Sequence, residues 1–146
     1  MDYVHLQWPN PASWGVERDV TSTCRVGCDL VAVAEVRASL ERFAERYLRR
    51  VYTSQEVRSC SGTPQCLAAR FAAKEAVVKV LRPADVALPW PSIEVQRQAG
   101  GWCTIALTGA AATLAAQQGL CGFDVSLSHE RDYAMAVVHA QSEREG

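Results

Sequence analysis

Residues 68–79 read AARFAAKEAVVK and predict a helix at the centre of the fold. The alanines favour a helix, and the apolar side chains of Phe71 and Val78 would anchor it to a sheet. Four charged side chains lie among these residues: Arg70, Lys74, Glu75 and Lys79. A Glu–Lys pair four positions apart is typical of a solvated helix face, whereas charges flanked by apolar neighbours need partners. By itself, the stretch leaves a solvated face and a binding site equally open.

The rest of the chain predicts short elements on both sides of this helix. Thr53 and Glu56 have the spacing of a capping box, so a helix should begin near residue 54. In chain order we expect a strand over 25–33, helices over 34–51, from 54 and over 65–81, strands over 92–98 and 102–108, a helix over 109–119, and strands over 123–130 and 133–140. Because the strands come as neighbouring hairpins, we expect an α+β fold in which a small antiparallel sheet packs on a long helix.

The composition describes one domain with a sizeable core. The chain has 146 residues, of which 49% are hydrophobic and 21% charged, and its formal net charge is −1. This balance argues against a nucleic-acid partner. The sequence has neither an apolar run of membrane-spanning length nor a secretory signal pattern, so we expect a cytoplasmic protein without a membrane partner. We divide the chain into an N-terminal extension, residues 1–23, and a main domain, residues 24–146.

Six cysteines occur along the chain, at positions 24, 28, 60, 66, 103 and 121. They form no C-x-x-C pair, and no histidines follow at zinc-finger spacing, so a zinc site is not expected. A cytoplasmic location implies reduced thiols. We therefore expect most of these cysteines to be small buried apolar residues.

A second acidic residue gives the charges of the central helix a chemical meaning. Asp29 interrupts the apolar strand VGCDLV, where a lone aspartate would ordinarily accept backbone N–H groups. Together, Asp29 and Glu75 would offer two hard oxygen ligands, which suits Mg²⁺ bound also by water and substrate phosphates. Arg70, Lys74 and Lys79 would then neutralise phosphate charge, and Ser128 and His129 add a hydroxyl and an imidazole. This set suits phosphoryl transfer, although no Walker A loop is present.

At these residues the chain resembles the holo-acyl-carrier-protein synthase family, the small type of 4′-phosphopantetheinyl transferase. Three motifs match in order: G-x-D-L-V at 27–31, R-F-A-A-K-E-A-x-x-K at 70–79, and S-L-S-H-E at 126–130. The similarity covers about residues 26–140, so residues 24–146 would form the phosphopantetheinyl transferase domain. Each motif alone is weak, but the helix motif is specific and the three together are more specific still.

The resemblance implies an activity. An enzyme of this family transfers 4′-phosphopantetheine from coenzyme A to a serine of an apo acyl carrier protein, releases adenosine 3′,5′-bisphosphate and requires Mg²⁺. Carried over by position, Asp29 and Glu75 would be the metal ligands, and Glu75 and Lys79 the catalytic residues. The coenzyme site would be lined by Arg70, Lys74, Lys79, Ser128 and His129. Either Glu75 or a metal-bound water would take the serine proton. The resemblance also implies a homotrimer with each coenzyme site at a subunit boundary.

Three departures from the family pattern keep an alternative open. Glu35 stands where the family commonly has an arginine that meets the acidic carrier. Arg82-Pro83 replaces a glycine after the helix, and Gly100-Gly101-Trp102 replaces a G-x-P hairpin. The alternative is a non-catalytic module that binds coenzyme A or a carrier protein. Whether the carrier serves fatty acid biosynthesis or secondary metabolism is also left open.

Overall fold

The structure, a computed structural model, describes residues 22–143. The proposed N-terminal extension lies outside these residues, except that Ser22 and Thr23 open the first strand. The elements are β1 (Ser22–Ala32), α1 (Val33–Val51), α2 (Ser54–Cys60), α3 (Pro64–Leu81), the short 3-10 helix η2 (Trp90–Ser92), β2 (Ile93–Arg97), β3 (Cys103–Leu107), α4 (Gly109–Gln117), β4 (Leu120–His129) and β5 (Tyr133–Glu143). The predicted order of helices and strands is confirmed.

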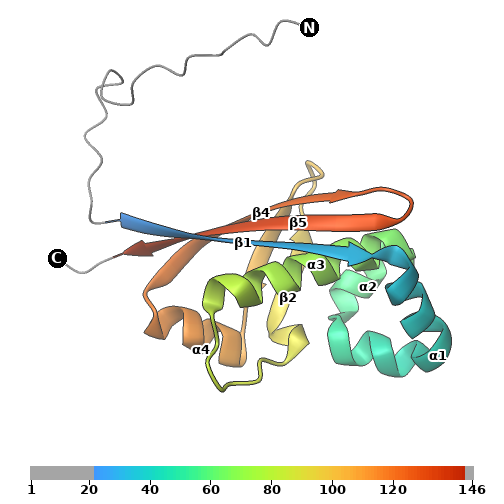
Figure 1. Ribbon diagram of the computed structural model, residues 1–146, viewed down its shortest axis with the longest axis horizontal. Coiled ribbons are helices and arrows are strands. Elements are labelled where there is room, and N and C mark those ends of the chain that lie inside the picture. Colours follow the sequence, from blue (N-terminus) through green and yellow to red (C-terminus); the bar gives the residue numbers. More distant parts are fainter. Residues whose placement is uncertain (1–21, 144–146) are drawn as a thin grey trace, which may run out of the picture.

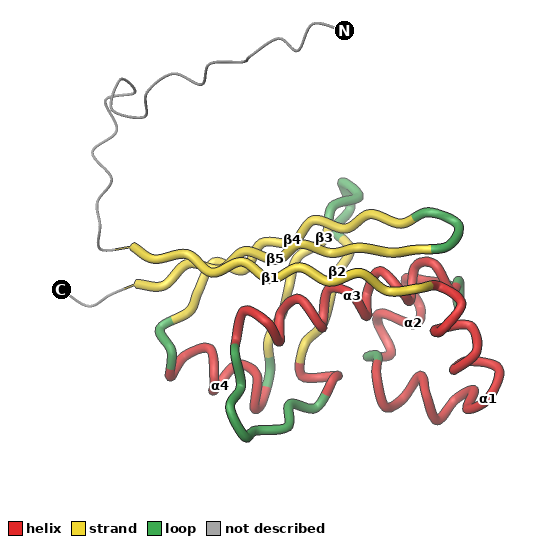
Figure 2. The backbone as a smooth tube through the Cα atoms, viewed as in Figure 1, coloured by secondary structure: helices red, strands yellow, loops and turns green. Residues whose placement is uncertain are grey.

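The five strands form one antiparallel sheet in the order β1-β5-β4-β3-β2. All four α-helices lie on the same side of the sheet in Figures 1 and 2, and α3 runs directly along β1 and β5. The expected α+β fold, a small antiparallel sheet packed on a long helix, is therefore confirmed. The capping box is also present, since the Thr53 side chain accepts from the Glu56 backbone N–H and the Glu56 carboxylate accepts from the Thr53 N–H.

Small residues bring α3 close to the sheet. A Cβ atom added at Gly27 would lie 2.1 Å from the carbonyl oxygen of Ala76, a distance that no side chain tolerates. Gly27 therefore lets β1 and α3 approach closely, and this glycine belongs to the G-x-D-L-V motif. The close approach places Asp29, two positions further along β1, beside the last turns of α3.

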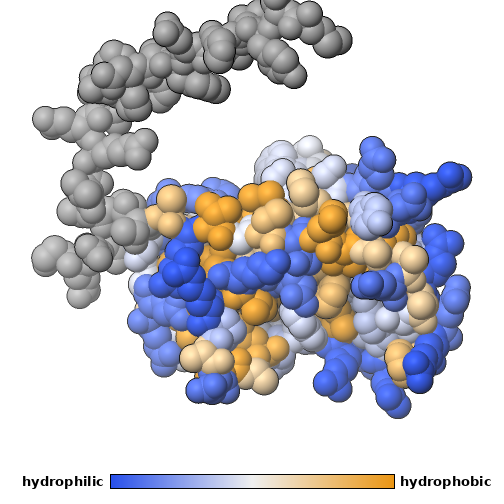
Figure 3. Space-filling view, in the orientation of Figure 1, coloured by the Kyte–Doolittle hydropathy of each residue, from blue (hydrophilic) through white to orange (hydrophobic). Residues whose placement is uncertain are grey.

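The two faces of the sheet differ in composition. Alternate residues of β5 from Ala134 to Ala140 are buried under α3, as is Val31 of β1. The opposite face is open: Val26, Leu30 and Met135 are 61%, 62% and 40% exposed. Figure 3 shows apolar surface interrupting the polar surface in the region of the strands. The sheet thus buries one apolar face within the chain and leaves a second one uncovered.

The helical spacing of apolar residues from Val36 to Val51 predicts a stripe that includes Phe43 and faces the core. This prediction is wrong at Phe43, which is 40% exposed. Ala44 has φ 42° and ψ −123°, so the helix is interrupted there and its 3.6-residue period does not continue across the interruption. The guanidinium groups of Arg42 and Arg46 lie 5.0 and 5.5 Å from the centre of the Phe43 ring. Phe43 therefore belongs to a basic surface and not to the core.

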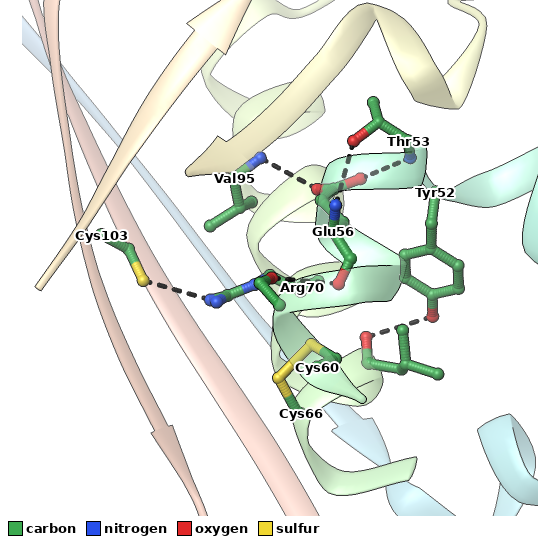
Figure 4. The surroundings of a disulfide bond; sticks show 10 residues. Tyr52, Thr53, Glu56, Cys60, Cys66, Arg70, Val95 and Cys103 are labelled. Atoms are coloured by element: carbon green, nitrogen blue, oxygen red, sulfur yellow. Dashed lines mark hydrogen bonds between the residues drawn. A yellow bond between two sulfur atoms is a disulfide. The ribbon is translucent and has the colours of Figure 1, made fainter. Parts of the chain in front are cut away.

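Two expectations about the cysteines are also wrong. Cys60 and Cys66 form a disulfide (Figure 4), because the turn between α2 and α3 brings their Cα atoms to 5.4 Å. Nor are most of the cysteines buried, since Cys24, Cys28 and Cys121 are exposed and Cys103 is half-buried. Cys24 and Cys28 share the parity of Val26 on β1, which places them on the open face of the sheet.

Candidate functional site

Asp29 and Lys79 meet where β1 passes the last turn of α3. The Lys79 ammonium lies 2.8 Å from Oδ1 of Asp29 and donates to the Cys28 carbonyl oxygen at 2.7 Å. The Lys79 side chain is 52% exposed and that of Asp29 17% exposed. The hydrogen bond that Lys79 donates to Asp29 is the main cause that raises the pKa of Lys79. Lys79 is thus a charged and accessible group beside a partly buried carboxylate.

Glu75 lies one turn before Lys79 on α3 and is half-buried. Burial raises the pKa of Glu75, the negative charge of Asp29 raises it further, and Lys79 lowers it. The two carboxylates therefore repel each other across the β1–α3 contact, which is where a cation would stabilise both. No group of three or more His, Cys, Asp or Glu residues within 22–143 is arranged to hold a metal ion. The pair fits Mg²⁺, which usually takes one or two carboxylates and completes its shell with water and phosphate oxygens.

Lys74 and Arg70 lie on a different side of α3, inside the fold. Lys74 is fully buried, its ammonium is 2.9 Å from Oε2 of Glu56, and it also donates to the backbone carbonyls of Trp90 and Ile93. Burial lowers the pKa of Lys74, while the Glu56 carboxylate opposes that change. The structure therefore brings Asp29, Glu75 and Lys79 together but separates Lys74 from them.

Arg70 is 4% exposed and donates from Nη1 to the sulfur of Cys103 at 3.1 Å (Figure 4). Its Nε is the one buried side-chain nitrogen or oxygen without a hydrogen-bond partner among the described residues. A buried guanidinium with an unused donor is costly unless an anion completes it. Arg70 therefore keeps one unused donor, whereas all three donors of Lys74 are used within the fold.

Ser128 and His129 lie at the end of β4, both exposed. Ser128 pairs with Met135 in the β4–β5 ladder, which puts it on the open face of the sheet, opposite α3. Together with Leu30 and Tyr133, these two residues line a pocket of about 320 Å³. Within one copy of the chain, Ser128 and Glu75 therefore face opposite sides of the sheet.

A groove beside α3 was not predicted from the sequence. It consists of two adjoining hollows of about 740 and 620 Å³, which share Arg50 and Trp90. Trp90 packs edge-on against Phe71 of α3, with ring centres 5.2 Å apart. Phe71, Glu75 and Val78 recur at helical spacing along α3, and this periodicity was the available signal. The loop before Trp90 has no periodic sequence pattern that would have predicted its contact with Phe71.

None of the described helices combines the length and the apolar character that a membrane span requires.

Comparisons with known proteins show the family to which the chain belongs. The model of the family described as the 4′-phosphopantetheinyl transferase superfamily matches residues 25–138. Over 126 residues the chain is 41% identical to the holo-[acyl-carrier-protein] synthase of Desulforudis audaxviator, which covers 82% of this chain and 96% of that relative. The corresponding enzyme of Gloeobacter violaceus is 41% identical over 118 residues, 78% of this chain and 89% of that relative.

Solved structures give the same result for the fold. The ACPS–CoA complex from Chronobacterium ammoniagenes matches with a TM-score of 0.74 and 28% identity, covering 84% of this chain and 99% of that one. The acyl carrier protein synthase of Mycobacterium tuberculosis matches with a TM-score of 0.64 and 35% identity, covering 79% and 94%. The chain therefore belongs to the 4′-phosphopantetheinyl transferase superfamily, as an enzyme of the holo-[acyl-carrier-protein] synthase type.

Proposed function

We propose that this protein catalyses the Mg²⁺-dependent transfer of 4′-phosphopantetheine from coenzyme A to a serine of an apo acyl carrier protein. The observation that carries the proposal is the meeting of Asp29, Glu75 and Lys79 at the β1–α3 contact. A pair of carboxylates and an accessible lysine match the needs of phosphoryl transfer, which depends on positioning and on charge neutralisation.

The transfer has one bond change at phosphorus. The carrier serine oxygen attacks the pantetheine-bearing phosphorus of the pyrophosphate, and the bond to the other phosphate breaks, which releases adenosine 3′,5′-bisphosphate. The serine proton goes to Glu75 or to water. Lys79 is exposed, so its ammonium is free to turn from Asp29 to the leaving phosphate. Mg²⁺ held by Asp29 and Glu75 would neutralise the pyrophosphate charge. Glu75 and Lys79 are thus the proposed catalytic residues.

We further propose that the protein is a homotrimer whose coenzyme sites lie at subunit boundaries. The open face of the sheet, with Val26, Leu30 and Met135 exposed, is apolar surface that a second copy would cover. In one copy, Ser128 and His129 lie at the end of β4, and Ser128 is on the face of the sheet opposite α3. A neighbouring copy would bring them to the metal ligands, and Arg70 would meet coenzyme phosphate with its unused donor.

The carrier protein is the acidic partner in this proposal. Glu35 lies in the first turn of α1, whereas basic residues follow in its second half: Arg42, Arg46, Arg49 and Arg50. An acidic carrier would therefore meet the later part of α1.

We also propose a cytoplasmic location. The Cys60–Cys66 disulfide is an observation against this location, because disulfides are rare in reducing compartments.

Intact-mass spectrometry tests the proposal. The protein is incubated with coenzyme A, Mg²⁺ and a panel of apo carrier proteins, with and without EDTA. We expect a gain of one phosphopantetheine on a carrier that disappears with EDTA. No gain on any carrier, with coenzyme A still bound in calorimetry, would favour the non-catalytic binding module.

A further inference from the structure

The buried residues in the middle of α3 are mostly alanines. Five alanines on this helix are buried: Ala68, Ala69, Ala72, Ala73 and Ala76. Methyl groups allow close approach, but they interlock little with the residues opposite, so they restrict rotation and sliding of a helix less than large side chains do. Larger buried side chains lie toward the ends of α3, at Leu67, Val77, Val80 and Leu81. The orientation of the middle of α3, which decides where Glu75 points, therefore depends also on polar contacts.

One buried carboxylate provides such contacts. Glu56 on α2 is fully buried and accepts from three elements: the Thr53 N–H at 2.8 Å, the Val95 N–H of β2 at 2.9 Å, and the Lys74 ammonium of α3 at 2.9 Å. Figure 4 shows Glu56 between the N-terminus of α2 and the backbone of Val95. Glu56 therefore ties the start of α2, the centre of α3 and the edge strand β2 to one point.

Lys74 extends this connection to the groove. Its three N–H donors have three acceptors: the Glu56 carboxylate and the carbonyl oxygens of Trp90 and Ile93. Trp90 in turn packs on Phe71 and forms part of the groove beside α3. A lysine with every donor used inside the fold has none left for a coenzyme phosphate.

Lys74 also precedes Glu75 directly. Successive helical side chains differ by about 100° around the axis, so fixing Lys74 inward points Glu75 toward Asp29. We infer that Glu56 and Lys74 are positioning residues, which hold α3 and Trp90 so that Glu75 and the groove wall keep their reactive geometry. This inference rests on the proposed transferase function, and it gives Lys74 a different role from the coenzyme contact that the family pattern suggests.

Three variants separate the two roles of Lys74: Glu56→Gln, Lys74→Met, and the double variant. Removing one partner leaves the other buried without its counter-charge, whereas removing both often restores a neutral, packed interior. We measure kcat and KM for coenzyme A at a temperature where circular dichroism shows each variant folded. The matched control is Gln55→Ala, which breaks the exposed hydrogen bond from Arg58 to Gln55 on α2, the helix that carries Glu56.

A second readout follows the groove wall without turnover. In a background carrying Trp8→Phe, Trp14→Phe and Trp102→Phe, Trp90 is the only remaining tryptophan of the chain. Its emission wavelength and its quenching by iodide report the position of the indole in the absence of coenzyme A and Mg²⁺. If Lys74→Met does not fold, Glu56→Gln and the double variant still give both comparisons.

We expect kcat/KM to fall at least about tenfold in each single variant, since small misplacements of catalytic groups have effects of this size. The double variant should recover to within about threefold of the wild type, and the Trp90 emission should shift in the single variants and return in the double variant. Gln55→Ala should match the wild type in both readouts.

Two outcomes would overturn the inference. If Lys74→Met raises KM while Glu56→Gln behaves as the wild type, and the double variant is no better than Lys74→Met, then Lys74 binds the coenzyme directly. If all three variants melt earlier but keep wild-type kinetics and Trp90 emission, the pair serves stability alone. If the wild type does not transfer phosphopantetheine, the proposed transferase function is wrong. The Trp90 emission still tests the positioning role in that case, because the expected shift in the single variants and its return in the double variant do not require turnover.

Discussion

Two lysines of α3 each pair with a carboxylate, and the pairs are close to identical in length. Lys79 lies 2.8 Å from Asp29, and Lys74 lies 2.9 Å from Glu56. They differ in their surroundings, since the Lys79 and Asp29 side chains are 52% and 17% exposed, whereas those of Lys74 and Glu56 are both at 0%. The first pair belongs to the candidate catalytic site, and the second to the interior.

The difference shows that burial, more than distance, decides what a charge pair does. An exposed lysine exchanges partners at little cost because water replaces the lost contact. A fully buried pair cannot open without leaving an uncompensated charge in a medium of low dielectric constant. Lys79 is therefore suited to meet an incoming phosphate, whereas Lys74 is suited to hold elements together.

The largest effect should come from the two proposed metal ligands. Asp29→Ala and Glu75→Gln remove one of two carboxylates from the site, so we expect the transfer rate to fall by on the order of 10³-fold or more. The rate is measured by intact mass of the carrier, and circular dichroism serves as the control for folding. A variant that transfers at a near wild-type rate would show that the residue is not a metal ligand.

The comparison of the two lysines predicts opposite results for stability. Lys74→Ala should lower the free energy of unfolding by roughly 3–5 kcal/mol, because it leaves the Glu56 carboxylate buried and unpaired. Lys79→Ala should leave the stability close to that of the wild type while lowering the transfer rate. Urea unfolding measures both. Equal losses of stability in the two variants would contradict the distinction drawn from burial.

The disulfide should have an intermediate effect. Cys60 and Cys66 close a loop with a sequence separation of 6, so reduction should lower the free energy of unfolding by roughly 2 kcal/mol. Thermal melts with and without dithiothreitol measure this change. The double variant Cys60→Ser/Cys66→Ser is the control, and its melting temperature should not respond to the reductant. A wild type that is equally unresponsive would indicate that the two thiols are not joined.

The smallest effect concerns the ionisation of Glu75. Burial, and then the charge of Asp29, raise the pKa of Glu75 above its ordinary value of 4.5 in the folded protein. The folded state thus holds the Glu75 carboxyl proton more tightly than the unfolded state does. The protonated carboxyl group therefore contributes fully to the free energy of unfolding below pH 4.5, and this contribution is lost as the pH rises through the folded pKa. Above that pH the folded protein carries an ionised Glu75 that is disfavoured by burial and by Asp29, and Glu75→Gln removes this unfavourable charge.

We therefore expect Glu75→Gln to be slightly more stable than the wild type at pH 7, by about 0.5 kcal/mol or less, since solvent screens a half-exposed group. Urea unfolding in EDTA at pH 7 and below pH 4.5 measures the difference, which should shrink at the lower pH. A variant that is less stable at pH 7 would show that the Lys79 attraction outweighs burial at this position.

Local patterns were sufficient for the order of the elements. Thr53 and Glu56 have the spacing of a capping box, and the structure forms both of its hydrogen bonds. The same carboxylate also accepts from Val95 and Lys74, which lie 39 and 18 positions away along the chain. No local pattern contains these partners, so the role of Glu56 in joining three elements was not predictable.

Periodicity was a weaker guide to which face a side chain occupies. Phe43 has the helical spacing of a core residue, but the interruption at Ala44 leaves it exposed. Ser128 lies within the S-L-S-H-E motif at the end of β4, yet its pairing with Met135 places its side chain on the face of the sheet opposite α3. Both outcomes depend on backbone geometry and strand register, which arise from packing of distant segments.

The sequence alone determined the family and the α+β fold, and it predicted that Asp29 and Glu75 lie close together. These features depend on short motifs and on hydrophobic periodicity. Only the tertiary structure decided which charges of AARFAAKEAVVK reach solvent. Successive residues of a helix point in directions about 100° apart, and the sheet covers one side. Lys74 and Glu75 are adjacent in the chain, but packing against β2 buries the first and leaves the second beside Asp29.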